Sequence, residues 1–228
     1  MGNNKNDSSK IVSDFIWTKL FWKKIQYLCK RLNCLKITEM LNDNLFAQIE
    51  TIQNEITNKR KEISKLRKQW QPEAVIDYTL LNHQNQPINL YSFFDERNEL
   101  LVVHNMGKSC VYYTLWADEI NGIRLPLADR APFVVVSPDA PEVQKEFAAS
   151  RNWQFNMLSA QESSFIKDLG FEKDTESYLP GVSTFKKTDE GVFRVNYDFL
   201  GPGDTYCSVW HLLDLLPNKV NGWQPKYN

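Results

Sequence analysis

The clearest hydrophobic pattern in the chain is a heptad stripe, in which apolar side chains are separated alternately by three and four positions: Ile49, Ile52, Ile56, Ile63, Leu66 and Trp70. Lys59 occupies the one polar position of this stripe. The spacing predicts an amphipathic helix over residues 40–71, stopped by Pro72. Asn42 or Asp43 is expected to cap its start. Such a helix packs against the rest of the chain or forms a homodimer, and we assign it no chemistry.

Residues 1–39 form a basic leader that also has apolar positions at helical spacing, interleaved with Lys and Arg: Ile11, Phe15, Trp22, Ile25, Leu28, Leu32 and Leu35. We interpret this leader as an amphipathic helix that packs on the body or is poorly ordered. Binding to a membrane surface is one alternative. Another is that Met40 is the native start. The pattern does not choose among these interpretations.

Residues 72–228 alternate between strand and helix signals. We expect strands over Ala74–Leu81, Ile88–Tyr91, Leu100–His104, Phe133–Ser137, Phe155–Leu158, Val182–Lys187 and Val192–Asp198. Helices are expected over Cys110–Arg124, Glu142–Arg151, Ser163–Leu169 and Ser208–Leu216. The short, continuously apolar strands are typical of a sheet covered on both faces, and parallel strands need helical crossovers. The turn at residues 188–191 predicts an antiparallel hairpin. The sequence therefore predicts an α/β fold: a mixed sheet with helices on both faces, in the thioredoxin element order, preceded by a long helix.

Composition supports a sizeable folded domain. The 228 residues are 42% hydrophobic, 24% charged and 13% aromatic, which is enough for a substantial core. Charge is uneven, because residues 1–71 hold 14 basic and 7 acidic side chains, a net +7 that leaves −8 on the remainder of a chain whose total is −1. The acidic body is a poor partner for phosphate backbones, so we expect no nucleic-acid partner.

Four cysteines in a chain of this length do not make a disulfide scaffold. The polar start lacks the features of a secretory signal, and charge interrupts every apolar run before the length of a transmembrane helix. We therefore expect a cytoplasmic protein without a transmembrane segment.

Cys110 is the residue that points most directly to chemistry. It follows a buried strand by a short loop and opens a predicted helix. Unpaired N–H groups in the first helical turn favour a thiolate, and Lys108 adds positive potential. A thiolate is a nucleophile toward peroxides and disulfides. The alternative is a buried, inert cysteine, because cysteine is among the most buried residue types.

Several segments resemble the bacterial thioredoxin-like family catalogued as domain of unknown function 899. They are Val102–Cys110, the Leu115–Gly122 stretch that contains Trp-Ala-Asp, Tyr178–Ser183, Trp210–Pro217 and Gly222–Pro225. Together they span nearly all of residues 72–228, and the heptad helix before them also suits the family. The resemblance implies a thioredoxin-like domain. It implies no defined activity, since the family itself has none assigned.

The chain departs from the family at one position. Many members carry Cys-x-x-Cys at this turn, whereas Tyr113 stands here in place of the second cysteine. A dithiol–disulfide cycle at this turn is therefore excluded, but monothiol chemistry is not. Ser183 stands where thioredoxins place a cis-proline, so the resemblance implies that Val182 and Ser183 lie beside Cys110.

Three further groups are candidates for the same site. Cys207 opens the last predicted helix and is a candidate resolving thiol for an oxidised Cys110. Cys207 and His211 share a helix face and could bind a metal together with Cys110 or His104, although the usual four-ligand set is missing. Trp116 and Asp118 follow Cys110 at helical spacing and either line the site or hold the helix. Asp118 is a candidate for proton transfer, with a structural hydrogen bond or an exposed position as the alternative.

These observations predict a thiol-dependent redox protein of the peroxiredoxin or thioredoxin type, with Cys110 as a single nucleophile acting on an unidentified oxidant or thiol substrate. Neither a cofactor nor a resident metal is expected. The alternative is a non-catalytic interaction module that keeps the fold and has lost its redox cycle. Tyr113 favours the module and the retention of Cys110 favours the enzyme, so the sequence leaves enzymatic activity open.

Overall fold

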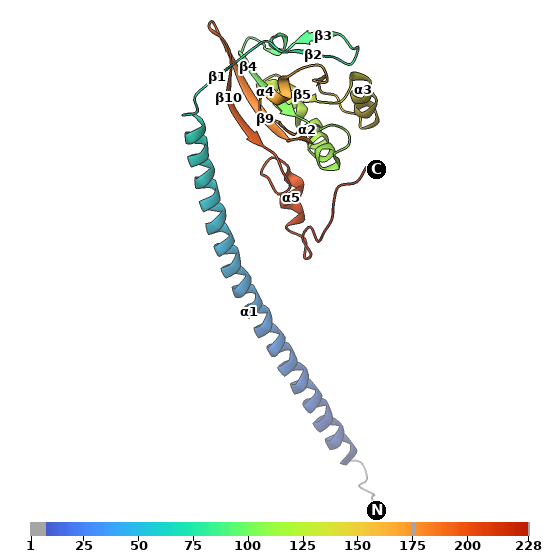
Figure 1. The fold of residues 1–228 in the computed structure, drawn as a ribbon. Helices are drawn as coiled ribbons and strands as arrows, with labels where there is room; N and C mark the ends of the chain where they lie inside the picture. The colour runs from blue at the N-terminus through green and yellow to red at the C-terminus, as the bar shows by residue number, and fades with distance from the viewer. Residues whose placement is uncertain (1–7, 175–176, 228) are drawn as a thin grey trace, which may run out of the picture. The chain divides into compact units, whose positions relative to one another are not determined.

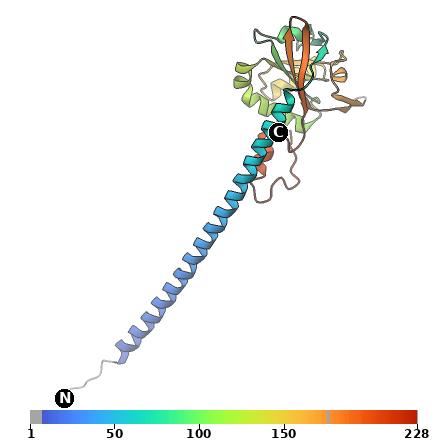
Figure 2. The ribbon, with the colours of Figure 1, turned by 90° about the vertical axis from the view of Figure 1, so that its left-hand side faces the viewer.

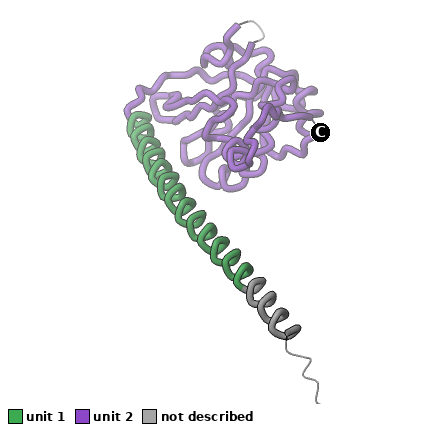
Figure 3. The backbone as a smooth tube through the Cα atoms, turned by 90° about the horizontal axis from the view of Figure 1, so that it is seen from below, with its two compact units in different colours: residues 1–68 green, residues 69–228 purple. Residues whose placement is uncertain are grey.

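The computed structural model describes residues 8–174 and 177–227, with side chains from residue 22 onward. Ile11 and Phe15 of the predicted leader stripe lie outside the described side chains. The chain divides into two compact units, residues 1–68 and 69–228, which Figure 3 draws in green and purple. Each unit is described by itself below.

The described part of the first unit is a single helix, α1 (Ser8–Arg67), about 90 Å long at 1.5 Å per residue. Figures 1 and 2 show it as one continuous helix. It runs without interruption through the expected boundary at residues 39 and 40, so Asn42 and Asp43 lie inside it and do not cap it. It ends before Pro72. Trp70 does not continue the helical stripe, because its ring packs edge-on against Tyr197 at 5.2 Å.

The second unit is built on an eight-stranded sheet with the strand order β1-β10-β9-β4-β5-β6-β2-β3 (Figure 1). The strands are β1 (Glu73–Val75), β2 (Thr79–Leu81), β3 (Pro87–Asn89), β4 (Glu99–His104), β5 (Phe133–Ser137), β6 (Met157–Ser159), β9 (Gly181–Thr188) and β10 (Gly191–Phe199). A separate two-stranded ribbon joins β7 (Glu172–Asp174) to β8 (Ser177–Tyr178).

The centre of the sheet is parallel and its flanks are antiparallel. β4, β5 and β6 run parallel, and the crossovers between them are α2 (Val111–Arg130) and α3 (Pro141–Ser150). The hairpin predicted around residues 188–191 is present, and β9 pairs antiparallel with β4. The predicted mixed sheet is therefore confirmed.

One predicted strand is wrong, because residues 74–81 form β1 and β2 rather than a single strand. β1 pairs with β10 near one edge of the sheet, whereas β2 pairs with β6 near the other. In a flat sheet these strands would lie about 29 Å apart, since neighbouring strands are about 4.8 Å apart. The stretch from Val75 to Thr79 can span at most about 14 Å. The sheet must therefore be strongly curled.

α4 and α5 are shorter than predicted, α3 is shifted by one residue without a change in length, and α2 is longer. α2 continues past the expected end at Arg124 to Arg130, although it contains Pro126. α4 (Phe165–Asp168) is a single turn, followed by Gly170 at a φ of +78°, and α5 covers Ser208–Leu213. A short 3-10 helix, η1 (Leu90–Phe93), follows β3.

Two hydrophobic cores cover the two faces of the sheet. The first core contains Val102, Val134 and Leu158 from the sheet together with Phe165 of α4 and Phe171. The second core contains the alternate sheet residues Val103 and Val135, which pack against α2 and α5. The period-two alternation of side chains along a strand produces this division, and helices lie on both faces as predicted.

We expect Gly181→Ala to destabilise the second unit by roughly 3 kcal/mol, because over-packing of a filled core is costly. A Cβ at this position would lie 2.1 Å from Cε1 of Phe171 and 2.6 Å from the carbonyl oxygen of Asp198. Urea unfolding of the full chain measures the loss.

The matched control is Gly122→Ala within α2, where an added Cβ meets nothing within 4 Å. Alanine is the better helix former, so this change should stabilise by roughly 0.5–1 kcal/mol. Equal effects of the two substitutions would contradict the packing around Gly181.

Candidate functional site

The loop between β4 and α2 is fixed by its own hydrogen bonds. The backbone N–H of Asn105 donates to the carbonyl of Val136 at 2.7 Å, and its side-chain oxygen accepts from the N–H of Gly107 at 2.7 Å. Gly107 has a φ of +95°, a backbone conformation that favours glycine. The loop thus reverses direction and delivers Cys110 to the start of α2.

Asp139 holds this loop from the neighbouring strand end. Its Oδ2 accepts a hydrogen bond from the backbone N–H of Lys108 at 2.7 Å. A Cβ at Gly107 would lie 2.8 Å from Oδ1 of Asp139, so this close approach also requires glycine. Sequence reasoning missed Asp139. Its position directly after β5 was the available signal, because the carboxyl ends of parallel strands meet at one edge of a sheet.

Cys110 is the N-cap residue of α2. Its carbonyl accepts from the backbone N–H groups of Tyr113 and Thr114, both at 3.1 Å, and its own N–H donates to the carbonyl of Gly107 at 3.2 Å. The residue is half-buried and packs against the second core. The thiol therefore stands at the positive end of a 20-residue helix and keeps access to solvent.

Tyr113 is part of the core beneath the thiol. Its side chain is 0% exposed, and the hydroxyl has no hydrogen-bond partner in the described part of the chain. Burial, together with the nearby Cys110, raises the pKa of Tyr113 well above its usual value. The N–H of Gly181 lies close enough to favour the phenolate electrostatically, without good hydrogen-bond geometry. Tyr113 is thus a neutral phenol in the place of a second cysteine.

Tyr227 approaches the thiol from the far end of the chain. Its hydroxyl donates to the carbonyl of Lys108, and its ring packs edge-on against Phe147 at 5.9 Å. Burial and the neighbouring Cys110 and Asp139 raise the pKa of Tyr227, although a hydrogen bond with Thr114 opposes the shift. No pattern in the sequence indicated that this residue belongs to the site.

The expectation that Ser183 lines the site is wrong. Its hydroxyl is buried and lies 2.8 Å from Nε2 of His104, whose ring stacks on Phe171 at 3.7 Å and Phe165 at 5.6 Å. These rings belong to the first core, on the sheet face opposite Cys110. Strand alternation explains the error. Val182, opposite Val103 in the register, is the neighbour that faces the α2 side.

Cys207 lies in the same core as Tyr113 and is fully buried. Burial, together with a hydrogen bond between its thiol and Glu119, raises the pKa of Cys207 to about 12. Burial alone would raise the pKa of Glu119, but hydrogen bonds from Cys207 and Ser208 outweigh burial and lower it. In this conformation Cys207 is a protonated hydrogen-bond donor rather than a nucleophile.

Asp118 and Trp116 hold α2 in place. The Asp118 carboxylate pairs with Arg151 and accepts from the indole N–H of Trp153 at 2.8 Å. Trp116 is buried, with its ring 6.0 Å from those of Tyr113 and Trp210. Asp118 therefore ties α2 to the segment that follows α3. The side chain of Lys108 is exposed, and only its backbone contributes to the loop.

No group of three or more metal-ligating side chains occurs among the described residues. His104 cannot join Cys207 and His211, because it faces the opposite core.

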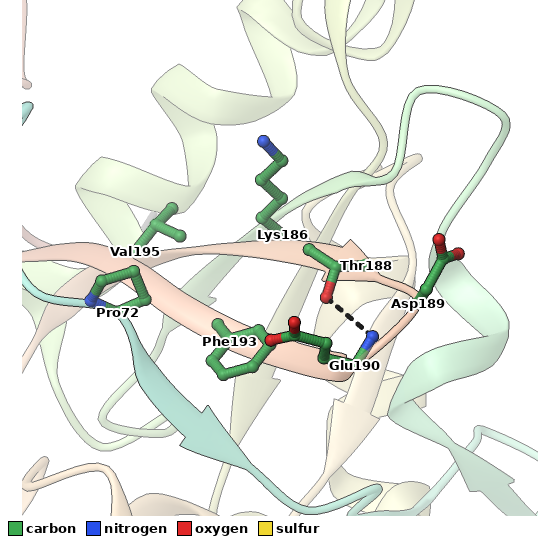
Figure 4. A pocket seen from close by; sticks show the side chains of 7 residues that line it. All are labelled: Pro72, Lys186, Thr188, Asp189, Glu190, Phe193 and Val195. Carbon is green, nitrogen blue, oxygen red and sulfur yellow. Dashed lines mark hydrogen bonds between the residues drawn. The ribbon is translucent and has the colours of Figure 1, made fainter.

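A surface pocket formed by Pro72 and the β9–β10 hairpin lies away from Cys110 and is lined by Lys186, Thr188, Asp189, Glu190, Phe193 and Val195 (Figure 4). None of the described helices is long and apolar enough to cross a membrane.

The family described as "Bacterial protein of unknown function (DUF899)" matches residues 45–224. The chain belongs to this family. The resemblance noted in the sequence is thereby confirmed, and the family match covers the C-terminal part of α1 as well as the sheet. No curated protein matches the chain significantly.

Solved structures similar to this family member include peroxiredoxins and thiol peroxidases. A PrxQ mutant from Xylella fastidiosa has 12% identity and a TM-score of 0.50 over 60% of this chain and 90% of its own. A peroxiredoxin-like protein from Aquifex aeolicus has 14% identity and a TM-score of 0.48, covering 57% and 75%. A thiol peroxidase from Chromobacterium violaceum has 15% identity and a TM-score of 0.48 over 62% of this chain and 84% of its own. At these identities the likeness shows the thioredoxin-like fold alone.

We expect the stability of the second unit to fall as the pH drops below about 6.5, in part because of His104. Burial lowers the pKa of His104 to about 3. As the pH falls, this imidazole is therefore protonated in the unfolded chain before it is protonated in the folded chain. The stabilisation from neutral His104 is fully present above about 6.5, the pKa of histidine in the unfolded chain, and it is lost as the pH falls toward 3. Between pH 8 and pH 5 the loss is roughly 2 kcal/mol.

Urea unfolding at several pH values, compared between the wild type and His104→Gln, measures this contribution. The variant should be less stable at pH 8 but should lose less stability on acidification. An identical pH dependence in both proteins would show that His104 is not the buried neutral group.

Proposed function

We propose that the chain is a monothiol redox protein in which Cys110 is the nucleophile toward a hydroperoxide. The observation that carries the proposal is the position of Cys110. It is half-buried at the first turn of α2, on a loop fixed by Gly107 and Asp139. A helix N-terminus stabilises negative charge, and a thiolate is the reactive form of cysteine.

The proposed reaction has two stages. The Cys110 thiolate attacks one oxygen of the hydroperoxide, the O–O bond breaks, and the alkoxide leaves and takes a proton from solvent. Sulfur is oxidised by two electrons to a sulfenic acid, and the peroxide is reduced to an alcohol. A small-molecule thiol then displaces water to form a mixed disulfide with Cys110. A second thiol attacks that disulfide, which releases the Cys110 thiol and a disulfide of the small molecule.

The reducing thiol is external in this proposal because neither nearby candidate suits the role. Tyr113 cannot form a disulfide. Burial, together with a contact with Glu119, raises the pKa of Cys207 and keeps its thiol protonated. A sulfenic acid at the half-buried Cys110 is therefore left to a thiol from solution. The cytoplasmic setting expected from the sequence, where such thiols are abundant, belongs to the same proposal.

A non-catalytic interaction module is the second candidate, favoured by Tyr113 in place of the second cysteine. The same fold accommodates either function. The two candidates differ in one measurable property, namely whether Cys110 is consumed by peroxide and regenerated by thiol.

We expect peroxide to oxidise Cys110 selectively and thiol-dependent peroxide consumption to require it. Cys110→Ser should reduce consumption to the uncatalysed background, because the nucleophile is lost. The Cys29→Ser/Cys34→Ser variant is the matched control, since both residues are exposed on α1, and it should retain wild-type turnover. Peroxide consumption and peptide mass spectrometry provide the measurements.

Peptide mapping also separates the two reduction routes. The proposal requires a sulfenic acid or a mixed disulfide at Cys110 and no Cys110–Cys207 link. A Cys110–Cys207 disulfide, with loss of turnover in Cys207→Ser, would replace external reduction with internal resolution. Unchanged peroxide consumption in Cys110→Ser would refute the enzyme and support the interaction module.

A further inference from the structure

The apolar stripe of α1 is exposed along its whole described length. Counted in heptads, Ile49, Ile56 and Ile63 occupy position a. Position d is filled by Leu45, Ile52, Lys59 and Leu66. The apolar members of this set are between 46% and 64% exposed. An exposed hydrophobic seam that recurs over three heptads is the pattern of a coiled coil.

The side of α1 opposite the apolar stripe is polar, so the helix is not suited to burial on all sides. Positions b, c and f of these heptads are polar, charged or small: Ala47, Glu50, Thr51, Asn54, Thr57, Asn58, Lys61, Ser64, Lys65 and Lys68. One narrow face of the helix is therefore apolar, as in a seam between two helices. β-branched residues at a, together with leucine at two of the four d positions (Leu45 and Leu66), favour two strands, and the polar Lys59 at d restricts the number of strands further.

We propose that residues 45–67 of α1 pair with the same residues of a second copy of this chain, as a parallel, in-register, two-stranded coiled coil. The side chains at positions e and g decide the orientation. In a parallel pair, position g of one helix faces position e of the partner five residues later. Glu55 then faces Arg60 of the partner subunit, and Glu62 faces Arg67 of the partner subunit.

Both of these contacts join opposite charges, and each occurs twice in the symmetric dimer. In an antiparallel pair, g would face g and e would face e. Glu55 and Glu62 would then meet glutamates, and Arg60 and Arg67 would meet arginines. Charge complementarity therefore selects the parallel arrangement.

Lys59 is the polar exception in the seam. Its Nζ lies 2.9 Å from Oε2 of Glu62, so the charged end is drawn from the d position toward the flanking g position. The methylene groups of lysine can cover the seam while the ammonium group stays in water. A polar seam residue lowers stability and restricts the number of strands. We therefore expect Lys59→Leu to stabilise the assembly, seen as a higher melting temperature.

The first experiment measures mass by light scattering on the full chain. The wild type should have twice the mass of one chain, and Ile52→Asp/Ile56→Asp should have the mass of one chain. Asn54→Asp/Lys61→Asp places two aspartates at outward f positions and is the matched control, which should remain dimeric. A monomeric or trimeric wild type, or a monomeric control with intact helix content, would overturn the proposal.

The second experiment tests the charge pairing. Glu55→Lys/Glu62→Lys and Arg60→Glu/Arg67→Glu should each lose the dimer, because every g–e contact becomes repulsive. A mixture of the two variants should recover it as a heterodimer. Failure of the mixture to form this heterodimer would count against these pairs.

The third experiment fixes the orientation and register. In a Cys29→Ser/Cys34→Ser/Cys110→Ser background, Lys59→Cys should form an interchain disulfide on mild oxidation, since two d positions meet at the seam. Asn54→Cys, at an outward f position, is the control and should not. A dimer whose Lys59→Cys chains fail to link would be antiparallel or out of register, which would contradict the proposal.

Discussion

The parallel pairing of β4 with β5 is the constraint on which the candidate site depends. It places the carboxyl ends of both strands at one edge of the sheet, with Val103 opposite Val135 and His104 opposite Val136. The loop after β4 is then within reach of the residue that follows β5. Because of this proximity, the Asp139 carboxylate accepts a hydrogen bond from the backbone N–H of Lys108, and Gly107 permits the close approach. The position of the thiol at the start of α2 follows from these contacts rather than from the cysteine itself.

The two faces of the sheet treat polar groups differently. On the first face, Nε2 of the buried His104 lies 2.8 Å from the Ser183 hydroxyl and the ring stacks on two phenylalanines, while Nδ1 has no hydrogen-bond partner in the described part of the chain. On the second face, the hydroxyl of Tyr113 and the indole N–H groups of Trp116 and Trp210 are buried without hydrogen-bond partners among the described residues. Unpaired buried donors are costly. The face that carries Cys110 therefore holds three buried donors without a partner in the part of the chain that the structure describes, whereas on the first face His104 lacks a partner for one ring nitrogen.

Much of the fold could be predicted from the sequence because its signals are local. Continuous apolar runs marked β4 and β5, and the turn at residues 188–191 marked the hairpin. The division of residues 74–81 could not be predicted, since the separate pairings of β1 and β2 depend on the curl of the whole sheet. Cys110 at a helix start was predicted from its spacing. The face of Ser183 was not, because the comparison with a cis-proline position fixes a place along the chain but not the side of the strand. The partners of Asp118 could not be predicted, because Arg151 and Trp153 lie more than 30 residues away in the sequence.

The hydrogen bond from Tyr227 to the Lys108 carbonyl joins the reactive loop to a residue 119 positions later in the sequence. The surroundings of the thiol thus include a segment that contributes little to the two cores. Loss of Tyr227 would therefore alter the surroundings of the thiol while leaving the sheet intact, so thiol-labelling rates are comparable only between preparations that share this residue.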